Sequence, residues 1–215
     1  MVIDSAGPDT IVLGPTEEAP GRPFTAVDLI ERDVSILMTL IADVRGILQE
    51  VDAGTRSIEP YEKMAWKVDG LTHRLLICDE YRLRHRDETC VVGFFGERRT
   101  ELDPGPLEEA NTAVVAEFTK SPGILSYSSM ELPGERWANL VLHDDPIDRE
   151  YWRKSETHAE AAKRLSPIHY RNVRIHNARL IDALTESPSL VVERTKYFDF
   201  EGESEWRAVR ELVGV

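Results

Sequence analysis

Cysteine is scarce in this chain of 215 residues, which contains only Cys78 and Cys90. Both lie in apolar contexts, LLICDE and TCVVGFF. Buried free thiols are therefore expected, because a free cysteine behaves as a small apolar residue. The spacing excludes a CxxC site, and two cysteines give no disulfide framework.

Long apolar runs and an excess of positive charge are also missing. No stretch approaches the roughly 20 residues of a membrane-spanning helix, and no basic segment precedes an apolar one near residue 1. Lys and Arg number 26 against 39 Asp and Glu, giving a net charge of -13. The negative electrostatic potential around a chain with this net charge disfavours nucleic acid and anionic membranes as partners. We expect a cytoplasmic protein whose partners include neither.

The common catalytic signatures are absent as well. The sequence has no GxSxG, GxGxxG, P-loop or HExxH motif. A functional prediction therefore depends on fold and on single residues.

The first 23 residues contain several prolines and glycines, which break any periodicity. We expect a mobile tail in which residues 11–13 can add a short edge strand. From residue 24 the pattern changes, and apolar residues recur at alternating spacings of three and four between Val27 and Val51. This heptad pattern predicts a long helix that ends at Gly54.

A second set of apolar residues at similar spacings, from Tyr61 to Cys78, predicts a second helix after Pro60. Two helices joined by a short polar loop make an antiparallel hairpin over residues 24–86. The sequence leaves open whether this hairpin closes on itself or forms a dimer interface.

The remainder alternates strands and helices. We expect a strand over 89–101, a helix that ends at 121–123, strands at 124–131 and 136–143, a helix over 147–165 and a strand over 170–184. This order is the ferredoxin-like βαββαβ arrangement of an α+β protein. A further strand at 191–200 and a short helix at 203–212 follow. The predicted units are thus a flexible tail, a helical hairpin, a ferredoxin-like domain and a C-terminal helix, at 1–23, 24–86, 87–200 and 201–215.

Residues 89–184 resemble the dimeric α/β-barrel superfamily, which includes antibiotic-biosynthesis monooxygenase-like, haem-degrading and stress-responsive proteins. The resemblance rests on the order of elements, on an apolar strand that starts near Trp137 before an acidic turn, and on a W-x-x-S-x-x-H pattern at Trp152, Ser155 and His158. It implies a homodimer with the two sheets packed face to face. It also implies a small-molecule pocket between each sheet and its own helices, used for haem chemistry or for cofactor-free oxidation of aromatic polyketides.

His158 is the main catalytic candidate. A neutral imidazole there can act as a general base, or as the axial ligand if haem is the cofactor. The alternative is a histidine that only packs or caps its helix. The remaining candidates are ligand-binding residues, although aromatic side chains at such positions are often part of a core: Trp152, Ser155, Trp137, Tyr127 and Tyr170.

His143 precedes Asp144 and Asp145, which allows a mononuclear metal site. Paired aspartates before a helix are more simply explained as caps. The leading prediction is therefore an oxygenase-like or haem-dependent enzyme. The alternative is a non-catalytic ligand-binding or assembly module that self-associates through the helical hairpin.

Overall fold

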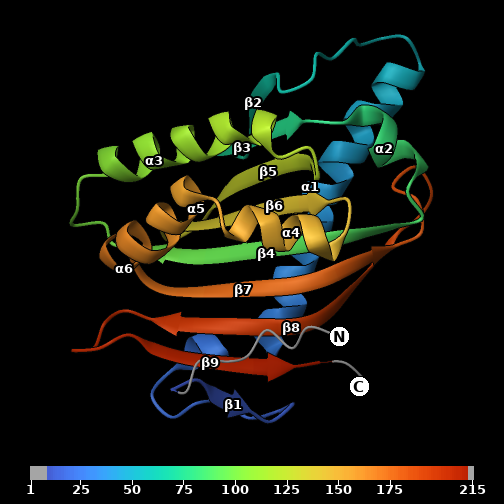
Figure 1. Cartoon of the computed structure of the whole chain (residues 1–215). Coiled ribbons are helices and arrows are strands. Elements are labelled where there is room, and N and C mark those ends of the chain that lie inside the picture. Colours follow the sequence, from blue (N-terminus) through green and yellow to red (C-terminus); the bar gives the residue numbers. More distant parts are fainter. Residues whose placement is uncertain (1–8, 213–215) are drawn as a thin grey trace.

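A computed structural model describes residues 9–212, whose nine strands form one mixed sheet in the order β1-β9-β8-β7-β4-β6-β5-β3-β2. Helix α1 crosses one face of the sheet and helices α3 to α6 lie on the other (Figure 1). The α+β class is confirmed. The strands are β1 Ile11–Leu13, β2 Lys63–Val68, β3 Leu71–Ile77, β4 Glu88–Arg98, β5 Ile124–Leu132, β6 Arg136–His143, β7 Tyr170–Ile181, β8 Ser189–Asp199 and β9 Trp206–Glu211.

The middle of the sheet contains the strands expected between residues 89 and 184. Strand β4 is followed by α3 (Gly105–Ala116), strands β5 and β6, a series of short helices and β7. These four strands are adjacent in the order β7-β4-β6-β5 and pair antiparallel throughout. Helix α3 and the short helices all lie on the same face (Figure 1).

Helix α1 (Asp28–Asp52) is the long helix that the heptad pattern predicts. Its apolar stripe packs on the sheet rather than on a second helix, and side chains such as Leu37, Ile41 and Val44 are fully buried against β4 and β6. The contact is close: a Cβ atom at Gly93 of β4 would lie 2.7 Å from Leu37 Cδ1. The helix therefore seals this face of the sheet.

One charged residue lies on the buried stripe of α1. Asp33 accepts hydrogen bonds from Arg174 Nε at 2.7 Å and Nη2 at 3.0 Å, and lies 2.9 Å from His176 Nε2. Thr195 completes the group through His176 Nδ1 at 2.9 Å. All four residues are buried, and the hydrogen bonds from His176 and Arg174 hold the pKa of Asp33 below its usual value despite the opposing effect of burial.

The prediction of a second helix over residues 61–78 is wrong. The chain forms an antiparallel pair of strands there, β2 and β3, joined at Asp69 and Gly70. Both residues have positive φ, 51° and 82°, as a type I′ turn requires, and Asp-Gly is a strong signal for that turn. Apolar residues three and four positions apart in these two strands therefore matched a helical pattern by chance. Between β3 and β4 the described chain forms one short helix, α2 (Glu80–His85).

Both end segments of the described chain differ from expectation. Strand β1 forms at 11–13 as expected, but it pairs in parallel with β9 where a terminal helix was predicted at 203–212. Residues 14–25 are anchored by the buried Arg210 of β9, whose guanidinium donates to the carbonyls of Gly14, Glu17 and Thr25 and to the Tyr197 hydroxyl. The described part of the expected mobile tail is therefore held on the sheet.

The helix expected over 147–165 is divided. Helix α4 (Pro146–Arg153) is followed by α5 (Glu156–Glu160), a π-helical turn (Ala161–Leu165) and α6 (Ser166–His169). The break falls at Ser155, whose hydroxyl accepts from His158 N at 3.2 Å and so caps α5. Trp152 and His158 therefore lie on different helices.

The four predicted units at 1–23, 24–86, 87–200 and 201–215 stay a prediction, although each contributes at least one strand to the common sheet. Among residues 9–212, no helix has the length and apolar character needed to cross a membrane.

Candidate functional site

The two faces of the sheet are covered to different degrees. On β4, Val91 and Phe95 face α1 and are buried, whereas Val92 and Phe94 face α3 to α6 and are only half-buried. The same alternation runs along β7, where Ala178 is buried and Ile175 and Asn177 are half-buried. The helices α3 to α6 therefore leave part of the sheet accessible, and the candidate site lies on this face.

An aromatic row joins several predicted site residues beneath these helices. The ring of His158 lies 5.3 Å from that of Trp152, which lies 5.1 Å from Phe118. Phe118 in turn is 5.5 Å from Tyr127. The structure thus brings His158, Trp152 and Tyr127 into one continuous cluster.

His158 is the titratable group of this row. Its Nδ1 atom is buried and has no hydrogen-bond partner among the described residues. Burial, with a smaller effect from the charge of Arg153, lowers the pKa of His158 below its ordinary value, against the opposing effect of the Arg153 backbone. A neutral imidazole with an unoccupied ring nitrogen can accept a proton or a ligand.

Ser155 is close to His158 but already engaged. Its hydroxyl donates to Glu117 Oε2 at 2.8 Å and caps α5, and Thr157 donates to the other oxygen of Glu117 at 2.7 Å. These two hydrogen bonds lower the pKa of the Glu117 carboxyl. The geometry gives Ser155 a role in positioning His158 rather than a free hydroxyl for a ligand.

His143 lies at the end of β6, across from Cys90 of β4. Burial lowers the pKa of His143 to about 3, with a contribution from Arg149, and Nδ1 lacks a partner in the described chain. The adjacent acids are used elsewhere: Asp144 pairs with Arg82 at 2.7 Å, and Asp145 caps α4, as expected. No group of three metal-binding side chains occurs within residues 9–212.

Cys90 and Cys78 are both buried free thiols, as predicted. Burial raises the pKa of Cys90 to about 11 and that of Cys78 to about 12. Neither thiol is therefore a ready nucleophile at neutral pH.

Tyr127 and Tyr170 are also placed on this face. The Tyr127 hydroxyl donates to Asn111 Oδ1 at 3.3 Å, and burial raises its pKa. The Tyr170 ring packs edge-on against Phe94 at 5.3 Å and lies over Gly96, where a Cβ atom would meet the ring at 2.5 Å. Gly96 is the cross-strand partner of Trp137, so Tyr170 and Trp137 lie at one end of the site.

Sequence reasoning missed two arginines at that end. The guanidinium of Arg74 lies 4.9 Å from the centre of the Trp137 ring, and that of Arg98 lies 5.8 Å from it. Arg74 comes from β3, which was predicted to be a helix. No local pattern links these three residues, because they lie on three strands.

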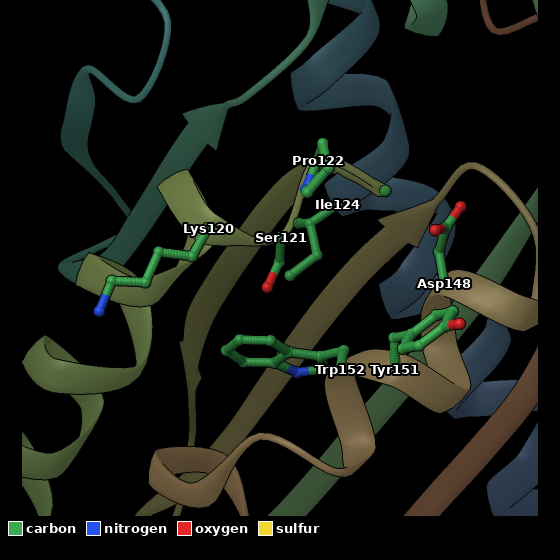
Figure 2. Close-up of a pocket in the computed structure, with 8 residues that line it drawn as sticks. Lys120, Ser121, Pro122, Ile124, Asp148, Tyr151 and Trp152 are labelled. Carbon is green, nitrogen blue, oxygen red and sulfur yellow. The ribbon is translucent and has the colours of Figure 1, made fainter.

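At the other end, a hollow of about 360 Å³ lies between the segment before β5 and helix α4. Figure 2 shows Trp152 facing Ser121 and Ile124, with Lys120 and Asp148 on opposite sides. Asp148 packs over Gly123, where a Cβ atom would lie only 2.0 Å from Asp148 Cγ. A second hollow of about 330 Å³ lies between α3 and the α5 region.

No protein-family model and no curated protein matches the chain significantly. Several solved structures are similar to part of it. A protein from Shewanella oneidensis is 9% identical over 46% of this chain and 96% of its own, with a TM-score of 0.41. SnoaB, a cofactor-independent oxygenase from Streptomyces nogalater, is 12% identical over 44% of this chain and 91% of its own, with a TM-score of 0.34.

An uncharacterised ferredoxin-fold protein from Listeria monocytogenes, related to antibiotic biosynthesis monooxygenases, is 12% identical. The similarity covers 57% of this chain and 86% of that protein, with a TM-score of 0.31. The description of this protein names one of the groups that the sequence resembles. Identities and TM-scores this low carry no argument about activity.

Proposed function

We propose that the chain binds a small aromatic molecule between its sheet and helices α3 to α6, and acts there as an oxygenase-like enzyme that needs no haem. The observation that carries the proposal is the buried, unpartnered Nδ1 of His158 beside Trp152, on the accessible face of the sheet. In this role Trp152 and Phe118 form an apolar wall, and His158 takes a proton from the bound molecule.

Haem fits the site less well. An axial histidine needs open space in front of a ring nitrogen. Nδ1 of His158 is buried, its ring packs on Trp152, and neither hollow described above is lined by His158. Any ligand of His158 therefore needs the α4–α5 segment to move, and a porphyrin needs a wider opening than a small aromatic molecule does. A haemin titration separates the two versions: a sharp Soret band in the wild type that shifts in His158→Ala would favour haem over the proposed chemistry.

Anthrone is a suitable probe for the cofactor-free reaction. His158 would remove a proton from its methylene carbon, the carbanion would be oxidised by dioxygen, and the products would be anthraquinone and water. We expect oxygen consumption and anthraquinone formation by the purified protein. Because the pKa of His158 is lowered, the base stays neutral at lower pH than an ordinary histidine does, so turnover should extend to more acidic pH than ordinary histidine titration would allow.

His158→Gln should abolish the reaction while leaving the thermal unfolding transition close to that of the wild type. His85→Gln is the matched control, because His85 is exposed on α2 and bonds only to the Tyr81 carbonyl at 2.8 Å. Equal turnover in both variants, or none in the wild type with any probe, would reject the catalytic role.

The expected homodimer and the assembly alternative both stay predictions. Face-to-face pairing of two sheets would use the face that α1 covers, and self-association through the heptad stripe would need residues such as Leu37 and Leu40, which are buried on the sheet. We propose that the chain needs no second sheet to complete its site. Light scattering that gives a dimer which dissociates on substitution of α1 stripe residues would contradict this.

A further inference from the structure

Trp137 lies between two cations from different strands. Arg74 of β3 and Arg98 of β4 place their guanidinium groups 4.9 Å and 5.8 Å from the ring centre. Trp137 and Arg98 are half-buried and Arg74 is exposed, so solvent reaches the group. We call these three residues the arginine–tryptophan cluster.

The two arginines are unusual because their charges are unpaired. Neither guanidinium group forms an ion pair or hydrogen bond with any of residues 9–212, whereas those of Arg82, Arg174 and Arg179 are each held by carboxylates. Glu131, the cross-strand partner of Trp137, accepts from Thr72 N at 2.8 Å. This hydrogen bond lowers the pKa of the Glu131 carboxyl, and the charge of Arg74 contributes to the lowering without a direct ion pair. In a chain with a net charge of -13, two free guanidinium groups on one indole are a local positive site.

Further free polar groups lie beside the cluster on the same face. Ser129 is the cross-strand partner of Arg74, and its buried Oγ forms no hydrogen bond of good geometry within the described chain. The half-buried Asn139 is the partner of both Ser129 and Phe94, and its amide also has no bond to the described residues. Groups that point to one accessible place without partners are what a polar ligand needs.

We infer that the arginine–tryptophan cluster binds the charged group of a flat organic anion, with Arg74 and Arg98 as the specificity-determining residues. The inference names the ligand class of the proposed function and rests on it for the aromatic part of the molecule. Guanidinium groups donate in a planar fork that matches a carboxylate, and the Trp137 ring both orients the guanidinium groups and offers an apolar surface. Ser129 and Asn139 supply further hydrogen bonds to the same group.

Binding of 2-naphthoate, compared with uncharged 2-naphthalenemethanol, tests the inference by calorimetry on the whole protein. We expect the wild type to bind the carboxylate at least about tenfold more tightly than the alcohol, since a charge-assisted hydrogen bond contributes more than a neutral one. Arg74→Gln and Arg98→Gln should each remove most of that preference and leave the affinity for the alcohol unchanged.

Arg136→Gln is the matched control. Arg136 precedes Trp137 on β6 and so points to the opposite face, where it donates to the Pro133 carbonyl at 2.9 Å. Arg136→Gln also removes one positive charge near the cluster, and this variant should keep the full preference for the carboxylate over the alcohol. Thermal unfolding of all three variants should match the wild type, because none of the three side chains is fully buried.

Equal affinity for acid and alcohol, binding of neither, or an equal loss in Arg136→Gln would overturn the inference. Equal binding of both probes would still leave an aromatic-binding site, so the proposed function would survive. Arginine-dependent binding of 2-naphthoate without any anthrone turnover would support the inference and reject the enzyme.

Discussion

The two faces of the sheet are built from the same strands but differ in how closely their side chains are packed. On the α1 face, neighbouring side chains pack closely, and Asp33 accepts hydrogen bonds from Arg174 and lies within hydrogen-bond distance of His176. On the opposite face, half-buried strand residues lie beside buried atoms without partners, such as His158 Nδ1 and Ser129 Oγ. Buried hydroxyls without a partner occur on both faces, Ser126 and Ser128 on the α1 face among them. The faces therefore differ in how closely their side chains are covered, and the proposed ligand site lies on the less covered face.

The largest expected effect is on the α1 face. Asp33→Ala removes the acceptor that the buried Arg174 and His176 share, and loss of one member of such a buried group costs about 3–5 kcal/mol. Urea unfolding should show this loss. Glu31→Ala, an exposed acid in the first turn of the same helix, should cost less than about 1 kcal/mol. Similar losses in both variants would remove the distinction between the faces.

Two glycines of β4 test the difference in packing. Gly93→Ala places a methyl 2.7 Å from the fully buried Leu37, and Gly96→Ala places one 2.5 Å from the Tyr170 ring. We expect a cost of about 3 kcal/mol for the first and about 1 kcal/mol for the second. Leu37 is enclosed by core side chains, whereas the Tyr170 ring, although buried, packs on Phe94, which is only half-buried and can shift. The reverse order in chemical denaturation would break the comparison.

The third prediction concerns acid stability. His143 has a pKa of about 3 in the folded chain, whereas in the unfolded chain it takes up a proton as pH falls through about 6.5. The stability that the neutral His143 contributes is therefore complete above about pH 6.5. It declines as pH falls towards about 3, and the loss in the free energy of unfolding is roughly 2 kcal/mol between pH 7 and 5. His158 adds an effect of the same sign. The slope of unfolding free energy against pH should decrease in His143→Leu, and an unchanged slope would assign the acid sensitivity elsewhere.

The smallest difference is expected between adjacent valines. Val91→Ala on the α1 face should cost about 2 kcal/mol, from lost burial and a residual cavity. Val92→Ala should cost about 1 kcal/mol or less, because its side chain is only half-buried. The two variants have identical chemistry and neighbouring positions, so equal losses would show that α3 to α6 cover the sheet as closely as α1 does.

Much of the fold could be predicted because strong local signals agreed with the final structure. The period of α1 and the turns around Asp145 and Pro133 are of this kind. The second helix failed because the spacing from Tyr61 to Cys78 was given more weight than Asp69 and Gly70, which fix a hairpin turn. Asp33 was not recognised, since nothing near it in sequence reveals partners on β7.

The site was accessible to prediction only in part. Trp152 and His158 are close in sequence and do meet, although Ser155 between them proved to be a helix cap. Arg74 and Arg98 are 24 positions apart, and both approach Trp137 only because β3, β4 and β6 lie in one sheet. Such a meeting is a property of strand order, which single residues do not encode.

The pairing of β1 with β9 has a consequence for how the chain is made. Strand β1 and the segment around Glu17 find their partners in β9 and Arg210, about two hundred positions later. Chains emerge from the ribosome in order, at about 5–20 residues per second. Strand β1 therefore cannot pair until β9 has been synthesised, which takes roughly ten seconds or more at these rates. Formation of this long-range contact should be a late step in folding.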